Sequence, residues 1–371
     1  MPATALPSQA DVEEFGRELD RIRDEIVASL GERDADYIRG VIAAQRKLEL
    51  GGRALLFASW LPPAWVAGTA ALAVAKILEN MEIGHNVLHG QWDWMRDPKI
   101  HSTTWEWDTA SPADQWKHSH NFVHHTWTNV LGKDRDIGYS LLRVSPEQRW
   151  HPVYLLQPIY NLLLALVFEY GIALYDLEVE RIPSGDKSLT ETLSQLRAIG
   201  GKVRRQIVKD YLAFPLLAGP GFLPVLAGNL TANLARNLWS HTIIFCGHFP
   251  EGAEVFTEDR LAGETRGEWY VRQLLGSCDI DGSRLLHLMS GNLSHQIEHH
   301  LFPDLPSNRY SEIASRVRAL CERFELPYNS GTLARQTGSV YKRILRLAFP
   351  GPGHRRAERA TPPAPDLQAV V

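Results

Sequence analysis

The chain has 371 residues, a formal net charge of −4 and an isoelectric point near 6.4. This balance, without any long basic run, argues against a nucleic-acid-binding surface, so we expect no nucleic-acid partner. The cysteines form no CxxC pair, which leaves no thiolate set for an iron–sulfur cluster or a structural zinc site and fits a reducing compartment: Cys246, Cys278 and Cys321. The first residues lack the basic and then apolar pattern of a cleaved signal peptide.

Residues 11–48 have the pattern of a helix with one apolar face. Between charged residues, apolar side chains recur at steps of four, three and four: Phe15, Leu19, Ile22 and Ile26. We expect this face to dock onto the rest of the protein. The sequence therefore predicts an N-terminal cytosolic helical segment over residues 1–48.

Four long segments without charged residues are typical of a membrane protein. They cover residues 54–75, 150–168, 211–235 and 237–250. The first and third runs have 22 and 25 residues, enough to span about 30 Å of hydrocarbon. One such run fits a buried helix of a large soluble protein, but several favour an all-α integral membrane protein.

The charges between the runs bear on the topology. If three runs each crossed once, the segment 176–210, with seven basic residues, would lie outside the cytoplasm, against the positive-inside rule. Two transmembrane hairpins, about four spans in all, avoid this: residues 50–84, turning at Pro62-Pro63, and residues 206–247, turning at 219–224. Residues 150–175 would then lie along the membrane interface, and both termini would be cytoplasmic.

These predictions divide the rest of the chain into two parts. Residues 49–345 form the predicted membrane domain, whose helices carry a cytosolic helical cap. Residues 346–371 are rich in proline and are predicted to be a disordered tail.

Nine of the fifteen histidines occur in three short clusters. The clusters read HNVLH from His85, HSHNFVHH from His118, and HQIEHH from His295. Neutral imidazole is a common ligand for transition metals, and residues i and i+4 share one face of a helix. So many ligands exceed one tetrahedral zinc site and suit two iron ions with open positions for dioxygen. The zinc-protease motif HExxH is absent, because Asn86 follows His85.

Other histidines are assigned one by one. His241, four residues after Asn237, is a further candidate ligand at the end of an apolar run, and His248 on the same helical face is a weaker one. His118 is interpreted as a spare residue and His287 as a core residue. No role is predicted for the rest: His101, His151 and His354. Glu298 fits a carboxylate that orients an imidazole as well as it fits a surface charge.

The boxes HNVLHGQWDW, HNFVHHTWTN and HQIEHHLFPDLPS resemble those of the membrane fatty acid desaturases, in particular the bacterial acyl-CoA and front-end branch. The resemblance covers about residues 80–315 and includes KDRDIGY at 133–139. It implies a cytosolic di-iron site with these ligands: His85, His89, His120, His124, His125, His241, His299 and His300. Asn237 would bind through water. Because Gln296 stands where many relatives have histidine, either Gln296 or His295 could approach the metal.

The resemblance also implies a reaction and its partners. A fatty acyl chain, carried by CoA, acyl carrier protein or lipid, would lose two hydrogens and gain a cis double bond, with O2 as co-substrate and membrane lipid around the enzyme. The sequence has no GxGxxG fingerprint after a strand and no HPGG-type haem motif, so a separate electron donor is expected: a ferredoxin, a cytochrome b5-like protein or a flavin reductase.

Two alternatives stay open at this stage. A related di-iron enzyme could hydroxylate its lipid instead of desaturating it. A membrane metal-binding or transport protein is the alternative from a different class, although a transporter should place ionisable residues within several full spans. Arg135, Arg143 and Arg149 could meet phosphates of CoA or an acidic donor, but a solvated basic face is the simpler interpretation.

Overall fold

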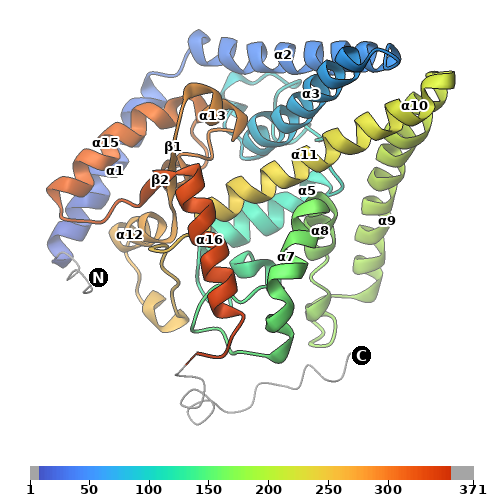
Figure 1. Cartoon of the computed structure of the whole chain (residues 1–371). Helices are drawn as coiled ribbons and strands as arrows, with labels where there is room; N and C mark the ends of the chain where they lie inside the picture. Colours follow the sequence, from blue (N-terminus) through green and yellow to red (C-terminus); the bar gives the residue numbers. More distant parts are fainter. Residues whose placement is uncertain (1–7, 352–371) are drawn as a thin grey trace.

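The computed structural model describes residues 8–351, and this part of the chain is predominantly helical, as predicted (Figure 1). The α-helices are α1 (Gln9–Ala28), α2 (Glu32–Phe57), α3 (Pro62–Leu78), α4 (Asn86–Leu88), α5 (Ala113–Trp116), α6 (His125–Trp127), α7 (Gln157–Leu166), α8 (Phe168–Tyr175), α9 (Leu189–Gln206), α10 (Phe214–Leu217), α11 (Phe222–His248), α12 (Arg266–Gly276), α13 (Arg284–Met289), α14 (Gln296–Leu301), α15 (Tyr310–Arg323) and α16 (Leu333–Leu347). Strands β1 (Asp279–Asp281) and β2 (Ser330–Thr332) pair in parallel.

Three further segments are π-helical: η1 (Glu79–His85), η3 (Lys117–His124) and η7 (Ile207–Ala213). Short 3-10 turns complete the secondary structure: η2 (Asp93–Met95), η4 (Ile137–Ser140), η5 (Pro152–Leu156), η6 (Val179–Arg181), η8 (Gly219–Gly221), η9 (Glu258–Leu261) and η10 (Ser307–Arg309). Because π-helical turns are rare and concentrate at functional sites, their positions in the chain are informative.

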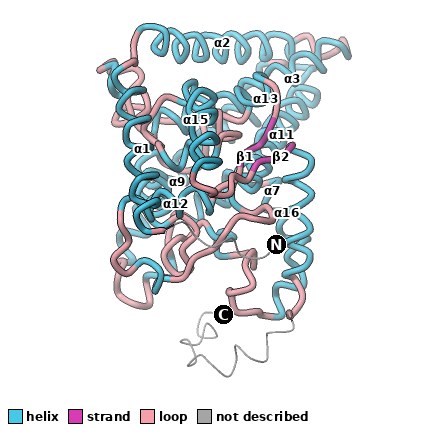
Figure 2. The backbone as a smooth tube through the Cα atoms, turned by 90° about the vertical axis from the view of Figure 1, so that its left-hand side faces the viewer, coloured by secondary structure: helices cyan, strands magenta, loops and turns pink. Residues whose placement is uncertain are grey.

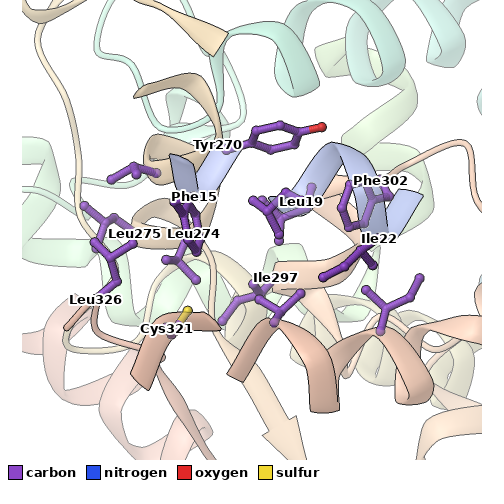
Figure 3. Close-up of a cluster of buried hydrophobic side chains, with 14 of the residues drawn as sticks. Phe15, Leu19, Ile22, Tyr270, Leu274, Leu275, Ile297, Phe302, Cys321 and Leu326 are labelled. Atoms are coloured by element: carbon purple, nitrogen blue, oxygen red, sulfur yellow. The ribbon is translucent and has the colours of Figure 1, made fainter. Parts of the chain in front are cut away.

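The single helix predicted over 11–48 is wrong, because two helices cover that region. The Ser29 hydroxyl donates to the Ile26 carbonyl at 2.9 Å and ends α1, while the Asp34 carboxylate accepts from the Gly31 N–H at 3.2 Å and begins α2. The chain is extended at Gly31, between the two helices. The predicted docking of the apolar face does occur: Figure 3 shows Phe15 and Leu19 among buried side chains of α12, α14 and α15.

Helix α11 runs through the middle of the molecule, with α2 and α3 on one side and α7, α8 and α16 on the other (Figures 1 and 2). Two helical hairpins form, with turns at residues 58–61 and 219–221. In the first, α2 turns at Ala58–Leu61 (58–61) into α3, whose first residue is Pro62. In the second, η7 and α10 turn through η8 into α11.

A buried ionic cluster joins the two hairpins. Asp210 of η7 accepts from Lys76 of α3 at 2.7 Å and from Arg53 of α2 at 3.0 Å. Removing one partner from such a cluster leaves a buried charge uncompensated, so the hairpins are held in one relative position.

Large apolar side chains remain exposed on the hairpins and on a separate surface formed by η5 and α7. Those on the hairpins are Phe57, Trp60, Leu61, Val66, Leu212, Leu216, Leu217 and Leu223. Those on η5 and α7 are Val153, Leu155, Leu156, Ile159, Leu162 and Leu163. Many exposed apolar side chains on neighbouring segments favour contact with membrane or protein at these places.

Within residues 8–351, no helix combines the length and apolarity needed to cross a membrane. The four predicted spans therefore stay a prediction. The tail predicted to be disordered over 346–371 begins later than expected, since α16 continues to Leu347, and its residues from 352 onward lie outside the described part of the chain.

Close contact between α2 and α3 depends on glycine. A Cβ at Gly52 would lie 2.9 Å from the Leu72 backbone nitrogen, whereas a Cβ at its neighbour Gly51 would meet nothing within 4 Å. We expect Gly52→Ala to destabilise the protein by about 1–3 kcal/mol through overpacking. Gly51→Ala should instead stabilise it by up to about 1 kcal/mol, because alanine favours the helix. Thermal unfolding of both purified variants tests this, and equal shifts would contradict the packing described.

Candidate metal centre

The first and second histidine boxes lie where π-helical segments meet short α-helical turns. η1 ends at His85, and His89 follows one turn later. η3 spans Lys117–His124, and its wider i→i+5 winding brings both His124 and His125 near His120, with ring centroids 5.1 and 5.0 Å away. The π-helical winding therefore accounts for the HxxxHH spacing of the second box.

The imidazoles converge in two groups whose nitrogen atoms lie within 4.8 Å of one another. The first group is His85, His89, His120 and His299, and the second is His124, His248 and His300. His125 lies between them, with its ring 4.7 Å from that of His89 and 4.4 Å from that of His300. Segments that are more than 200 residues apart in sequence thus meet at one place.

Two distances between ring nitrogens show how closely the imidazoles approach one another. The Nε2 atoms of His85 and His299 lie 3.3 Å apart, and those of His248 and His300 lie 3.2 Å apart. Two ligands bound to one metal at ~2.1 Å each would lie ~3.0–3.4 Å apart. Several ring nitrogens in the described chain are buried without a hydrogen-bond partner, on these residues: His89, His120, His124, His125 and His248. Such a donor set fits metal ions.

The opposite ring nitrogens are held by neighbouring polar groups. The Asp134 carboxylate lies 3.0 Å from His124 Nδ1, and the Tyr310 hydroxyl lies 3.2 Å from His299 Nδ1. His300 Nδ1 lies 3.1 Å from Gln273 Oε1 and 3.2 Å from the Thr128 hydroxyl. Outer contacts of this kind fix the ring orientation of metal-binding histidines.

Burial sets the protonation of these histidines. It lowers the pKa well below its usual range, with neighbouring imidazoles adding to the effect, for His85, His89, His125, His248, His299 and His300. These rings are therefore neutral, as a metal ligand must be. Burial also opposes the protonation of His124, but the charges of Asp134 and Asp136 outweigh it and raise the pKa of His124 to about 9.

The structure separates His241 from the two groups. Its Nε2 atom lies 3.1 Å from Asn161 Oδ1, and its ring stacks on Phe245 with centroids 3.8 Å apart. The side chain of Asn237 donates to the Leu166 carbonyl at 2.9 Å. His248, seven residues after His241 and the last residue of α11, takes the place beside the third box that the sequence analysis gave to His241.

Helix α14 also separates Gln296 from His295. The Gln296 amide nitrogen lies 3.0 Å from His248 Nε2, so it faces the imidazole groups. His295 lies away from them and stacks on His287, with ring centroids 4.6 Å apart. Glu298 accepts from the Tyr328 hydroxyl at 2.9 Å on the same side as His295.

Sequence reasoning missed the polar groups that hold the imidazoles: Asp134, Asp136, Tyr310, Gln273 and Thr128. Of these residues, only Asp134 and Asp136 could have been recognised from the sequence, because they form a DRD triplet shortly after the second box. His118 is exposed, as expected of a spare residue, whereas His287 is only half-buried and α13 has no buried residue, so the core interpretation of His287 is wrong. Arg135 pairs with Glu178 at 3.1 Å, and Arg143 donates to three backbone carbonyls, so neither side chain is a free anion site.

A narrow cavity of about 60 Å³ reaches His85 from between α8, α11 and the 107–116 segment. Its wall is mostly aromatic and aliphatic near the ring, including Trp107, Trp116 and Phe168, with the polar Asn237 and Ser240 along α11. This volume compares with about 30 Å³ per molecule of liquid water. The cavity thus gives the first imidazole group an apolar approach.

A sequence model of the family described as fatty acid desaturase matches residues 59–332. The chain belongs to the fatty acid desaturase family. The desaturase is 50% identical over 347 residues to an NADPH-dependent stearoyl-CoA 9-desaturase of Mycobacterium tuberculosis, covering 92% of this chain and 81% of that protein. It is 27% identical over 284 residues to an sn-1 linoleoyl-lipid 6-desaturase of a Synechocystis strain, covering 74% and 77% of the two chains.

A third relative is human fatty acid desaturase 3, which is 26% identical over 292 residues, covering 74% of this chain and 59% of that protein. All three relatives are desaturases by name, and they span bacteria and mammals. The desaturase is therefore an enzyme that acts on a fatty acyl substrate, and its histidine groups are compatible with a di-iron site. The transport alternative has no support among these relatives.

Asp134 offers a test of how the imidazoles are held. Asp134→Asn should weaken metal retention about 10–100-fold, because the amide cannot balance charge at His124 Nδ1. The measurement is iron per chain after dialysis against a chelator. Asp114→Asn is the matched control, since that side chain is 94% exposed. Retention of iron by Asp134→Asn at the level of the control would contradict this role.

Proposed function

We propose that the protein is an O2-dependent di-iron desaturase that introduces a cis double bond at position 9 of a saturated acyl-CoA. One observation carries the proposal: buried imidazoles from three boxes and from α11 converge with unpartnered nitrogens in a chain half identical to a stearoyl-CoA 9-desaturase. Per turnover, the acyl chain loses two hydrogens, and two electrons from a donor with two protons from solvent complete the reduction of dioxygen to two molecules of water.

The proposed ligands follow the two groups. His85, His89, His120 and His299 would hold one iron, and His124, His248 and His300 the other, with His125 between them. His248 thereby replaces His241 in the ligand set that the resemblance implied. Bound iron would supply the oxygen activation that removal of hydrogen from an unactivated methylene requires.

The residues around the cavity would place the substrate. The acyl chain would enter between Trp107, Trp116 and Phe168, where apolar contacts favour methylenes and exclude water. Because the cavity holds only about 60 Å³, the walls must move apart when the chain binds. Oriented binding beside His85 would then select which methylenes react.

The apolar surface supports a membrane location with the active site and both termini on the cytoplasmic side. We propose that the two hairpins enter the bilayer through their exposed turns, at Trp60 and Leu61 and at Leu216 and Leu217. The η5–α7 surface would lie along the interface, as predicted for 150–175. These placements keep the histidine groups at the inner ends of the hairpins, within reach of a soluble donor.

Electrons would come from outside this chain. The name of the Mycobacterium tuberculosis relative includes NADPH, but this sequence has no dinucleotide fingerprint. We therefore propose that a separate reductase, directly or through a ferredoxin or a cytochrome b5-like carrier, delivers electrons from NADPH.

Fatty acid analysis of a host that expresses the chain tests the function. The intact chain should add a cis-9 unsaturated acid, and His248→Gln should reduce that product at least 100-fold and lower bound iron. His241→Gln is the matched control on the same helix and should keep most of both. A hydroxylated product would contradict desaturation. Loss of iron in His241→Gln but not in His248→Gln would overturn the proposed ligand set.

A further inference from the structure

The face of α14 opposite the imidazole groups carries a second set of metal-binding side chains. Gln296, His299 and His300 point toward the imidazole groups, whereas His295 and Glu298, three residues apart, face strand β1. Asp279 of β1 lies there too, and the nitrogen and oxygen atoms of the three residues lie within 4.8 Å of one another. This set shares no residue with the two imidazole groups.

The three side chains are buried and close. His295 Nδ1 lies 3.8 Å from Asp279 Oδ2 and 4.0 Å from Glu298 Oε2. His295 is 7% exposed, Asp279 1% and Glu298 0%. Two carboxyl groups at such a depth are costly unless a cation or hydrogen bonds compensate them.

Hydrogen bonds satisfy only some of the polar atoms of these three side chains. Asp279 Oδ1 accepts from the Ile297 N–H at 3.0 Å, and the Tyr328 hydroxyl bridges Asp279 and Glu298. Neither ring nitrogen of His295 has a hydrogen-bond partner among residues 8–351, and Glu298 Oε2 has none there either. Of these atoms, His295 Nδ1 and Glu298 Oε2 lie 4.0 Å apart, within the set.

The positively charged side chain of Arg318 lies near only one of the three residues, Asp279. The Arg318 guanidinium lies 3.9 Å from Asp279 Oδ2 and 4.5 Å from the centroid of the Tyr328 ring, and its side chain is 43% exposed. It also lies 3.3 Å from Asp281, a second carboxylate. Arg318 therefore leaves the inner atoms of His295 and Glu298 without a counterpart.

We propose that Asp279, His295 and Glu298 bind one divalent transition-metal cation, separately from the two irons. Two oxygen ligands and one imidazole are a donor set that suits Zn²⁺ or Mn²⁺. Ligands of a tetrahedral zinc ion lie ~3.4 Å apart, so the two distances from His295 Nδ1 would shorten by about half an ångström when the ion binds. The Tyr328 hydroxyl would orient both carboxylates from outside.

The cation would act as a structural clamp. It would tie α14, which carries His299 and His300, to β1, and through Tyr328 to the segment that leads into β2 and α16. A ligand that binds only the folded state stabilises that state. The site does not depend on the desaturation proposal, because cation binding there requires neither iron nor substrate.

Zinc titration of the full chain in detergent, as purified with its iron, tests the site. After removal of free metal, the wild type should retain one equivalent of zinc per chain, with a higher melting temperature and an unchanged iron content. His295→Gln and Glu298→Gln should each lose that zinc and the thermal shift but keep their iron. His287→Gln is the matched control, because its ring stacks on His295 while it contributes no atom to the set.

Zinc K-edge absorption of the wild type gives a second readout that does not depend on how the variants fold. The expected spectrum has one imidazole and otherwise oxygen ligands. A spectrum with several imidazoles would mean that zinc had replaced iron, which overturns the proposal. So would a wild type that retains no zinc, or loss of iron together with zinc in His295→Gln.

Discussion

The convergence of buried, neutral imidazoles is the constraint on which the rest of the structure depends. Ring nitrogens with lone pairs lie 3.2 and 3.3 Å apart in the two closest pairs, and several have no partner within the described chain. Such an arrangement is unfavourable in a dry interior unless a cation binds. The Asp134 carboxylate and the Tyr310 hydroxyl contact the other ring nitrogens of His124 and His299. These contacts fix the orientation of the rings, so polar groups from distant segments of the chain meet at this site.

Local helix geometry makes that convergence possible. π-helical winding at η1 and η3 changes the direction of the side chains where the first and second boxes lie, and α14 divides its own faces between two sets of ligands. Packing against α12 and α15 fixes α14 from outside. The clustering of wide helical turns at the boxes agrees with the general association of π-bulges with function.

The sequence predicted much of this because periodicity and ligand type are local properties. It predicted a predominantly helical fold, which the structure shows, and three boxes whose histidines lie together in it. The two transmembrane hairpins stay a prediction. It did not predict the break at Gly31, which interrupts an otherwise continuous apolar pattern. The sequence could not decide between His241 and His248, because both lie on one face of α11. Only the tertiary position of α14 decides which of the two rings contacts His300. Asp134 and Tyr310 act through contacts whose partners cannot be inferred from spacing.

Iron K-edge absorption of the purified chain, combined with metal analysis, tests the central claim most directly. The account predicts two irons per chain with nitrogen and oxygen ligands only, and strong multiple scattering from several imidazoles on each iron. Sulfur ligands, or a single iron bound mainly by oxygen, would contradict it, because the two groups supply seven imidazoles and no thiolate.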